Sequence, residues 1–120
     1  MEGEKSKVLI IGAGPSGLAT LRHLKNSGVQ LQCVEMHDDF GGMWNYNPDT
    51  EFSIEIEKST HSFIRENHTV FNSMYEFLDT NVPIPVMQFK DFCKRKEGTF
   101  FSRPEFREYL SQYVAEFDLL

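Results

Sequence analysis

The stretch Lys7-Val-Leu-Ile-Ile-Gly-Ala-Gly-Pro-Ser-Gly-Leu18 decides the fold of this chain. Its aliphatic residues run into Gly12, Gly14 and Gly17 at G-x-G-x-x-G spacing, which predicts a buried strand, a tight turn and a helix. The first glycine allows the sharp reversal, the second lets a pyrophosphate approach the backbone, and the third lets the helix pack closely on the strand. The stretch therefore predicts the start of a Rossmann-like α/β fold.

The start of the predicted helix offers an anion site. Pro15 stands near the first helical position, where its missing N–H costs nothing, and Ser16 follows it. The free N–H groups and the positive end of the helix dipole then face a phosphate. A glycine-rich turn can also serve structure alone, so the residues that follow must decide between the two interpretations.

The residues after the helix favour dinucleotide binding. Asn26-Ser27-Gly28 predicts a helix stop with Gly28 as its left-handed cap. A second strand, Val29 to Val34, ends at Glu35. An acidic residue about 20 positions after the glycine turn can accept hydrogen bonds from the adenosine ribose. Together these parts favour a βαβ nucleotide site over a structural turn followed by an ordinary surface glutamate.

Composition limits the classes of partner. The chain has 120 residues, 12 Lys and Arg against 18 Asp and Glu, and a net charge of −6. This balance gives no electrostatic reason to expect nucleic acid or an anionic membrane surface, so phosphate contacts must come from backbone N–H groups. Hydrophobic content of 40% with 11 Phe argues for a core and against disorder.

The sequence shows no metal or membrane pattern. Cys33 and Cys93 lack metal-ligand spacing, and we expect reduced thiols in a cytoplasmic protein. The spacing of the four histidines also fits no metal site. The apolar run that begins at Val8 is too short and too broken by glycine to be a signal or membrane segment.

Two motifs downstream of Glu35 leave alternatives open. The loop from Met36 to Trp44 contains paired glycines that permit ligand approach, but it can equally be a turn with a packed Trp. Apolar residues between Met74 and Leu78 predict a helix that ends at Thr80-Asn81, and the two prolines that follow force an extended path. From the residues alone, Asn81 is a helix cap more readily than a site residue.

Three further elements are structural. The alternation Phe52-Ser-Ile-Glu-Ile56 predicts a short edge strand, and Gly98 predicts a turn after the solvated run Lys94-Arg-Lys96. Ser102-Arg-Pro-Glu105 is a capping box, and the helix it opens carries a broad apolar stripe from Phe106 to Phe117. Such a stripe predicts core packing.

In this order the motifs resemble the N-terminal part of the flavin-containing monooxygenase family. The resemblance rests on Gly12-Ala-Gly-Pro-Ser-Gly17, Glu35, Phe40-Gly-Gly-Met-Trp44, Ser73-Met-Tyr-Glu-Phe-Leu-Asp-Thr-Asn-Val-Pro83 and the segment from Phe101 to Leu120. It covers most of the chain from residue 7 onward, apart from residues 45–72.

The resemblance implies an enzyme that reduces FAD with NADPH and transfers one oxygen atom from O₂ to a nucleophilic nitrogen or sulfur of a small amine or sulfide. In this family the NADPH-binding glycine turn lies beyond the first 120 residues. We therefore expect residues 1–6 to be a disordered lead-in and residues 7–120 to be the first part of an incomplete doubly wound FAD domain, inactive alone. A membrane anchor of a complete enzyme would lie outside these residues.

The resemblance also assigns roles to residues. It implies that the FAD pyrophosphate is held by residues of the glycine turn, namely Gly12, Gly14, Pro15, Ser16 and Gly17. It implies that Glu35 binds the adenosine ribose, that Gly42, Met43 and Trp44 line the FAD, and that Thr80 and Asn81 lie against the flavin and nicotinamide. Asn81 is the expected catalytic residue, because an amide can donate a hydrogen bond without bringing a titratable proton.

Other classes remain in competition. A nicotinamide-dependent dehydrogenase needs the same βαβ unit but has no use for the Gly-Gly-x-Trp motif. Another FAD oxidoreductase, such as an amine oxidase, commonly carries Arg where Met43 stands. A truncated, non-catalytic nucleotide-binding fragment is also compatible with the sequence. No protein partner can be inferred.

Overall fold

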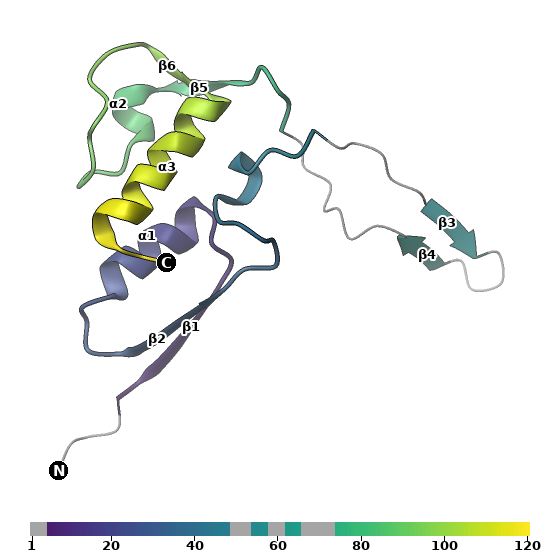
Figure 1. Cartoon of the computed structure of the whole chain (residues 1–120), viewed down its shortest axis with the longest axis horizontal. Helices are drawn as coiled ribbons and strands as arrows, with labels where there is room; N and C mark the ends of the chain where they lie inside the picture. The colour runs from purple at the N-terminus through teal and green to yellow at the C-terminus, as the bar shows by residue number, and fades with distance from the viewer. Residues whose placement is uncertain (1–4, 49–53, 58–61, 66–73) are drawn as a thin grey trace.

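The computed structural model describes residues 5–48, 54–57, 62–65 and 74–120. The helices and strands follow in the order β1 (Lys7–Ile11), α1 (Pro15–Leu24), β2 (Gln30–Val34), η1 (Gly42–Trp44), β3 (Ile54–Glu57), β4 (Ser62–Arg65), β5 (Asp79–Pro83), α2 (Ile84–Met87), β6 (Phe100–Ser102) and α3 (Arg103–Phe117). The strands β1 and β2 lie at one end of the molecule, β5, α2 and β6 lie at the other, and α3 extends between them (Figure 1).

The predicted βαβ unit is confirmed. β1 and β2 are parallel and paired from Lys7 opposite Gln30 to Ile11 opposite Val34. Because side chains alternate along a strand, Ile10 is buried, whereas Ile11 is 82% exposed on the opposite face. α1 buries Leu18 and Leu21, and their placement follows from helical spacing.

Two other local predictions need correction or restriction. α1 ends at Leu24, and its cap residue Lys25 is right-handed, so Gly28 is not the helix cap. Gly28 does have a positive φ of 82°, in the turn that leads to β2. The predicted edge strand matches β3, which pairs with β4 in an antiparallel hairpin. Its first residues, Phe52 and Ser53, lie outside the described residues.

The prediction of a helix that ends at Thr80-Asn81 is wrong. Only a turn forms before Leu78, whose N–H donates to the Tyr75 carbonyl, and β5 follows. β5 pairs with β6, the Leu78 carbonyl accepts from the Arg103 N–H at 2.7 Å, and these long-range bonds outweigh the local helical spacing. The expected extended path also ends early, because Ile84–Met87 forms α2 with a proline in its first turn.

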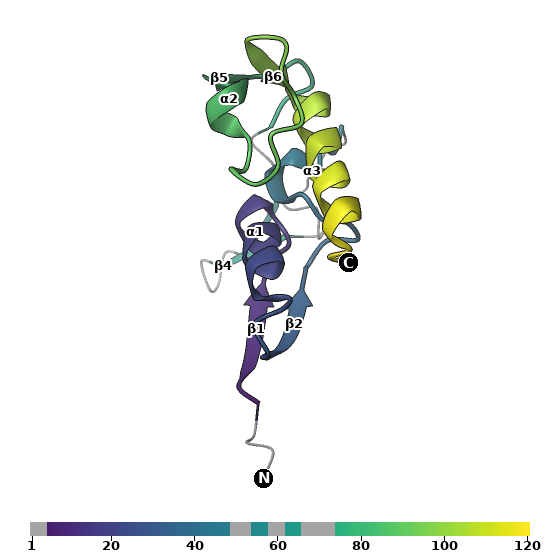
Figure 2. The same cartoon turned by 90° about the vertical axis from the view of Figure 1, so that its left-hand side faces the viewer.

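The core lies along α3, as its apolar stripe predicted. Figure 2 shows α3 running beside α1 and the β5–β6 region. The buried residues of α3 are Phe106, Tyr109, Leu110, Tyr113 and Val114. The capping box is confirmed: the Glu105 N–H donates to the Ser102 hydroxyl, and the Ser102 N–H donates to the Glu105 carboxylate at 2.8 Å.

Two buried tyrosines of α3 differ in their hydrogen bonds. The Tyr109 hydroxyl accepts from the Phe89 N–H at 2.7 Å and donates to the Phe92 carbonyl at 2.9 Å. Burial raises the pKa of Tyr109 to about 12, so this hydroxyl keeps its proton at neutral pH. The Tyr113 hydroxyl is buried and has no hydrogen-bond partner among the described residues.

We therefore expect opposite outcomes from the same substitution at these two positions. Tyr109→Phe leaves two backbone groups unpaired and should lower the free energy of unfolding by about 1–3 kcal/mol. Tyr113→Phe removes a buried polar atom without a partner and should leave stability unchanged or higher. Urea unfolding followed by far-UV circular dichroism measures both. Equal losses in the two variants would contradict the hydrogen-bond assignment.

Candidate dinucleotide-binding site

The first glycine turn requires glycine at two positions. Gly12 has a positive φ of 99°, which L side chains rarely adopt. A Cβ on Gly17 would lie 1.9 Å from the Gly12 carbonyl oxygen, so no side chain fits there. The end of β1 and the first turn of α1 are therefore as close as the G-x-G-x-x-G spacing predicted.

The N-terminal end of α1 is open to an anion. Its cap residue, Gly14, makes no side-chain capping bond, Pro15 opens the helix, and the first turn contains no acidic residue. The Leu18 N–H is the first to bond within the helix, to the Gly14 carbonyl at 2.9 Å. The preceding N–H groups, of Ser16 and Gly17, need an acceptor from solvent or a ligand.

A second glycine loop packs directly on the first. The Gly41 N–H donates to the Ala13 carbonyl at 2.9 Å, which fixes the loop on the turn. A Cβ on Gly42 would lie 3.1 Å from the Gly14 Cα, and one on Gly14 would lie 3.6 Å from the Gly42 Cα. The two backbones meet without side chains between them. Sequence alone had left open whether this loop is part of the site.

Glu35 ties the end of β2 to the first glycine turn. Its Oε2 accepts from the Ala13 N–H at 2.6 Å, and its Oε1 accepts from the His37 N–H at 3.0 Å. The Ala13 N–H, aided by that of His37, holds the pKa of the Glu35 carboxyl below its usual value despite partial desolvation. A carboxylate offers about four acceptor positions, so acceptor capacity remains for a further donor such as a ribose hydroxyl.

Trp44 has a structural contact of its own. Its ring lies 4.4 Å from the Phe106 ring of α3, centroid to centroid, and the residue is half-buried. The neighbouring Met43 is 56% exposed. The packing interpretation of Trp44 is thus realised, and any contact with a cofactor would use what remains accessible of the indole.

Thr80 and Asn81 occupy successive positions on β5 and therefore opposite faces. Thr80 is buried; its hydroxyl accepts from the Phe101 N–H at 3.1 Å and donates to the Val82 carbonyl at 3.0 Å. Asn81 is exposed. None of the described contacts joins Asn81 to the glycine turns. Its neighbour Thr80 connects to α3 through Phe101, whose ring centre lies 5.4 Å from that of Phe106.

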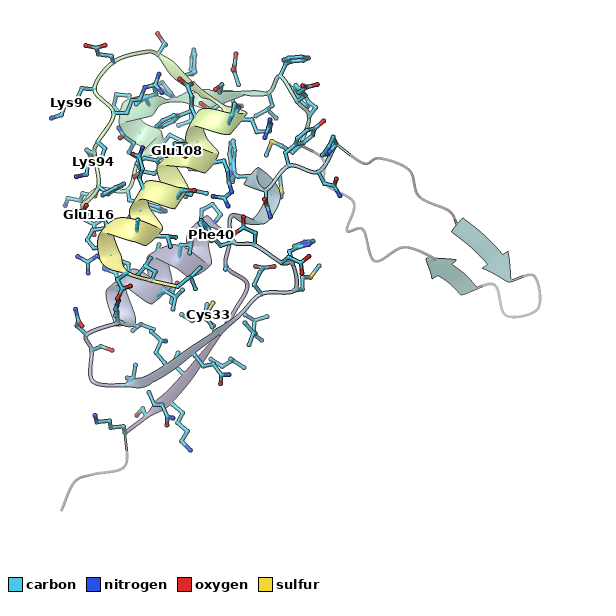
Figure 3. The ribbon with its side chains drawn as sticks, in the orientation of Figure 1. Cys33, Phe40, Lys94, Lys96, Glu108 and Glu116 are labelled. Carbon is cyan, nitrogen blue, oxygen red and sulfur yellow. The ribbon has the colours of Figure 1, made fainter. Side chains whose placement is uncertain are left out.

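Sequence reasoning missed Arg107 and Asp39. The Arg107 Nη2 lies 2.7 Å from an Asp39 carboxylate oxygen, 68 positions away along the chain. Figure 3 shows Phe40 of the same loop close to α3. No local motif signals a pair so distant in sequence, although both residues lie within segments that the sequence singled out.

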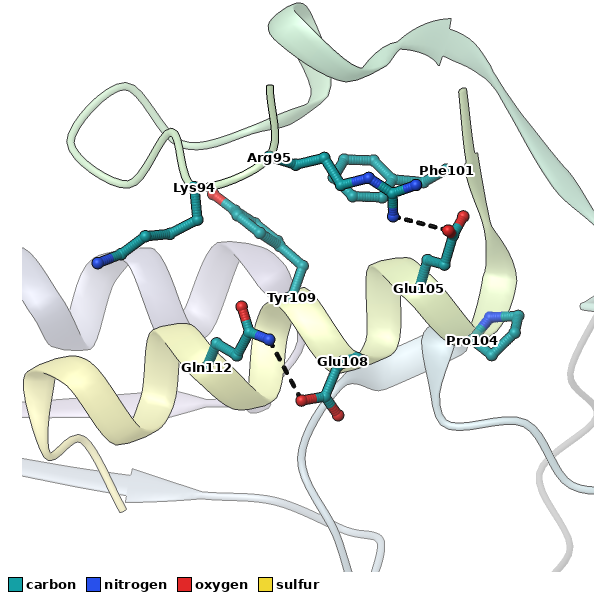
Figure 4. A pocket seen from close by; sticks show the side chains of 8 residues that line it. All are labelled: Lys94, Arg95, Phe101, Pro104, Glu105, Glu108, Tyr109 and Gln112. Carbon is teal, nitrogen blue, oxygen red and sulfur yellow. Dashed lines mark hydrogen bonds and ion pairs between the residues drawn. The ribbon is translucent and has the colours of Figure 1, made fainter. Parts of the chain in front are cut away.

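A separate hollow of about 380 Å³ lies on the other side of α3 (Figure 4). Its charged groups already have partners: Arg95 pairs with Glu105 at 2.7 Å, and the Gln112 amide donates to Glu108 at 3.3 Å. The predicted solvated run 94–96 contributes to its rim. Arg95 and Glu105 therefore neutralise each other, and Glu108 is hydrogen-bonded within α3.

The described residues hold no group of three or more histidine, cysteine or acidic side chains arranged for a metal. Both cysteines are free thiols. Within the same residues, none of the helices has the length and apolarity that crossing a bilayer requires.

A parallel βαβ unit with a glycine turn, an uncapped helix and an acid after the second strand defines a Rossmann-type dinucleotide-binding protein. The chain belongs to the NAD(P)-binding Rossmann-like domain family, whose profile matches residues 10–78. Within this fold it is similar to the N-terminal portion of flavin-containing monooxygenases.

Its relatives include a flavin-containing monooxygenase, FMO GS-OX-like 9 of Arabidopsis thaliana, at 36% identity over 92% of this chain and 24% of that protein. A trimethylamine monooxygenase of Pelagibacter sp. (strain HTCC7211) is 38% identical over 91% of this chain and 24% of its own length. The chain spans about a quarter of the length of these relatives.

Solved structures agree with this assignment. The S-allyl-L-cysteine S-oxygenase from Allium sativum has a TM-score of 0.74 and 32% identity over 97% of this chain and 26% of its own. An oxidised steroid monooxygenase bound to NADP has a TM-score of 0.65 over 97% of this chain and 18% of its own. At 18% identity, the second shows a likeness of fold alone.

The hydrogen bonds of Glu35 predict a pH dependence of stability. A carboxyl whose pKa is lower in the folded than in the unfolded chain, where it is about 4.3, stabilises the fold above that pH. The stabilisation is lost as the pH falls through the folded pKa. Glu35→Gln has no proton to gain, so it should be less stable at pH 7 and lose less of its remaining stability between about pH 5 and 3.

Urea unfolding at a series of pH values measures this difference. Glu97→Gln, at an exposed position, is the matched control and should follow the unaltered chain. An acid limb with the same slope in Glu35→Gln and in the unaltered chain would show that Glu35 does not carry the effect.

Proposed function

We propose that this chain is the FAD-binding part of an NADPH-dependent flavin monooxygenase that oxygenates nucleophilic nitrogen or sulfur in small molecules. One observation carries the proposal: two glycine loops meet, at Gly14 and Gly42, beside the uncapped N-terminal end of α1. A dehydrogenase of the Rossmann type needs the first loop and the helix, but not the second loop.

The names of the relatives support the substrate class. Among them are a trimethylamine monooxygenase and the senecionine N-oxygenase of Tyria jacobaeae, which is 32% identical, while the S-oxygenase from Allium sativum acts on sulfur. We infer a small amine or sulfide and oxygen as substrates of the whole enzyme. The two free thiols suit a reducing compartment, so the proposal places the chain in the cytoplasm.

The residues of the first turn fit a diphosphate. Backbone N–H groups at the start of α1, preceded by Gly14 without a side chain, would hold its oxygens, and Gly12, Pro15, Ser16 and Gly17 shape that turn. This suits a chain of net charge −6, in which acidic residues outnumber basic ones. Bound FAD would supply the electron transfer and oxygen chemistry.

The remaining cofactor contacts come from the edges of the site. Glu35 would accept from the adenosine ribose with the acceptor positions that Ala13 and His37 leave free. Gly42, Met43 and Trp44 would line the cofactor from the second loop.

We propose that Asn81 acts near the oxygen chemistry and that Thr80 supports Asn81 by fixing the strand that carries it. The Thr80 hydroxyl is committed to two backbone groups of the β5–β6 pair, so its contribution is to fix the strand. Strand alternation then presents the Asn81 amide on the opposite, exposed face, where it can orient a flavin or nicotinamide group without titrating.

A non-catalytic nucleotide-binding chain is the second candidate, because these 120 residues contain one G-x-G-x-x-G motif. The two candidates agree if the family activity belongs to a longer protein and this chain alone binds FAD without turnover. An amine oxidase is disfavoured by the monooxygenase relatives.

Gly14→Leu should strongly weaken FAD binding by the 120-residue chain. Gly14 has φ −72°, so a side chain is sterically allowed, but its outer atoms would fill the space between the glycine loops. If the diphosphate loses two charge-assisted bonds to the N–H groups at the start of α1, of about 2 kcal/mol each, binding weakens by roughly two to three orders of magnitude. Titration of FAD, followed by flavin fluorescence, measures the affinity.

Gly28→Asn is the matched control, because asparagine tolerates a positive φ and Gly28 lies in an exposed turn. Unchanged FAD affinity in Gly14→Leu would mean that the turn does not touch the pyrophosphate. Sustained NADPH oxidation by the 120-residue chain would contradict its proposed inactivity alone.

In a full-length enzyme that contains this segment, Asn81→Ala should keep FAD bound and NADPH oxidised but divert oxygen to hydrogen peroxide. The amide no longer orients the reacting groups, so less substrate is oxygenated per NADPH consumed. Parallel assays of NADPH, peroxide and oxygenated product measure the ratio. Asp79→Ala, which is also exposed on β5, is the control, and a normal product yield in Asn81→Ala would refute the role of Asn81.

A further inference from the structure

Arg107 of α3 makes two contacts with the second glycine loop, at Asp39 and Phe40, and one within α3, at Ser111. Its Nη2 lies 2.7 Å from Asp39 Oδ2, its Nη1 donates to the Ser111 hydroxyl at 2.7 Å, and its guanidinium carbon lies 4.2 Å from the centre of the Phe40 ring. The side chain is only 18% exposed. A planar guanidinium can bridge two acceptors while stacking on a ring, and this combination fixes its orientation.

The same side chain lies over Gly41. A Cβ on Gly41 would be 3.1 Å from the Arg107 Nε and 3.2 Å from its Cδ, so the absence of a side chain at Gly41 makes room for the arginine. Gly41 itself is buried and has a φ of 115°. The arginine therefore covers the residue whose N–H fixes the loop to Ala13.

The Asp39 carboxylate connects Arg107 to the loop backbone. Its Oδ1 accepts from the Phe40 N–H at 2.8 Å, while its Oδ2 holds Arg107. One carboxylate thus joins the loop backbone to the guanidinium of α3. Since Ser111 holds the other end of the guanidinium within α3, movement of the loop must break at least one charge-assisted bond.

We propose that Arg107, with Asp39 and Ser111, is a positioning device for FAD: it holds the Phe40–Trp44 loop in the conformation that receives the cofactor. This inference rests on the proposed function. Arg107 is not among the residues expected to contact FAD, and it acts through Gly41 and Gly42. It also couples the C-terminal helix of the chain to a site built by the first 44 residues.

The physical effect is pre-organisation. A loop with two successive positive-φ glycines, Gly41 and Gly42, has many alternative conformations when it is not held. Affinity falls in proportion to the fraction of molecules in which the binding conformation is populated. Arg107 raises that fraction before FAD arrives.

The chain contains a matched control at Arg95. Its Nη1 pairs with Glu105 at the same 2.7 Å, and its guanidinium carbon lies 5.6 Å from the centre of the Phe101 ring. This pair also involves α3 but lies at the hollow shown in Figure 4, away from the glycine loops. Arg95→Gln removes the same charge from a similar pair without releasing the loop.

The test is FAD titration of the 120-residue chain with the variants Arg107→Gln, Arg107→Lys, Asp39→Asn and Arg95→Gln. We expect Arg107→Gln and Asp39→Asn to raise the dissociation constant about tenfold, through a lower fraction of binding-competent loop. Arg107→Lys should recover part of the affinity because it keeps the charge but cannot bridge Asp39 and Ser111. Arg95→Gln should bind as the unaltered chain does.

Combining Asp39→Asn with Arg107→Gln should weaken binding little beyond either single change, because both break one interaction. Trp44 is the only tryptophan of the chain, so its acrylamide quenching without FAD reports directly on the loop. Quenching should rise in Arg107→Gln and Asp39→Asn, and stay unchanged in Arg95→Gln.

Each contrary result has a distinct meaning. Unchanged FAD affinity in Arg107→Gln, additive effects of the two changes, or an equal loss in Arg95→Gln would overturn the positioning role. If the unaltered chain bound no FAD, the proposed function would fall, while Trp44 quenching would still support or overturn the hold of Arg107 on the loop.

Discussion

The arrangement of the site depends on the two backbone groups of one buried residue, Ala13. Its N–H donates to Glu35, and its carbonyl accepts from the Gly41 N–H. A buried residue, 1% exposed, cannot leave these groups unpaired without a large cost in free energy. The glycine turn, the end of the second strand and the second glycine loop are therefore held together at a single position.

Around this position the chain uses two kinds of support. Hydrogen bonds and an ion pair hold the loop from Asp39 and Arg107, while aromatic packing holds it through Trp44 and Phe106. Both supports come from α3, more than 60 residues away in sequence, as the separation of 68 positions between the ion-pair partners shows. A close aromatic pair contributes about 0.5–1.5 kcal/mol beyond its buried area. The final helix is thus part of the site as well as the core.

The segment around Asn81 shows where local patterns mislead. Helical spacing before it is real in the sequence, yet the backbone pairs with β6 instead. Two distant hydrogen bonds decide the matter: the Thr80 hydroxyl accepts from Phe101, and the Leu78 carbonyl accepts from Arg103. A strand changes what the segment can do, since it separates Thr80 and Asn81 onto opposite faces where a helix end would project both.

The sequence by itself determined the βαβ unit, the glycine turn, the position of Glu35 and the capped final helix, because each follows from steric demands or periodicity within a few residues. Only the tertiary structure decided that the second glycine loop packs on the first, that the Thr80 hydroxyl bonds to distant backbone, and that Arg107 pairs with the loop. The physical reason is distance along the chain. Contacts between residues 20 to 70 positions apart depend on how whole elements pack, and no local pattern records that packing.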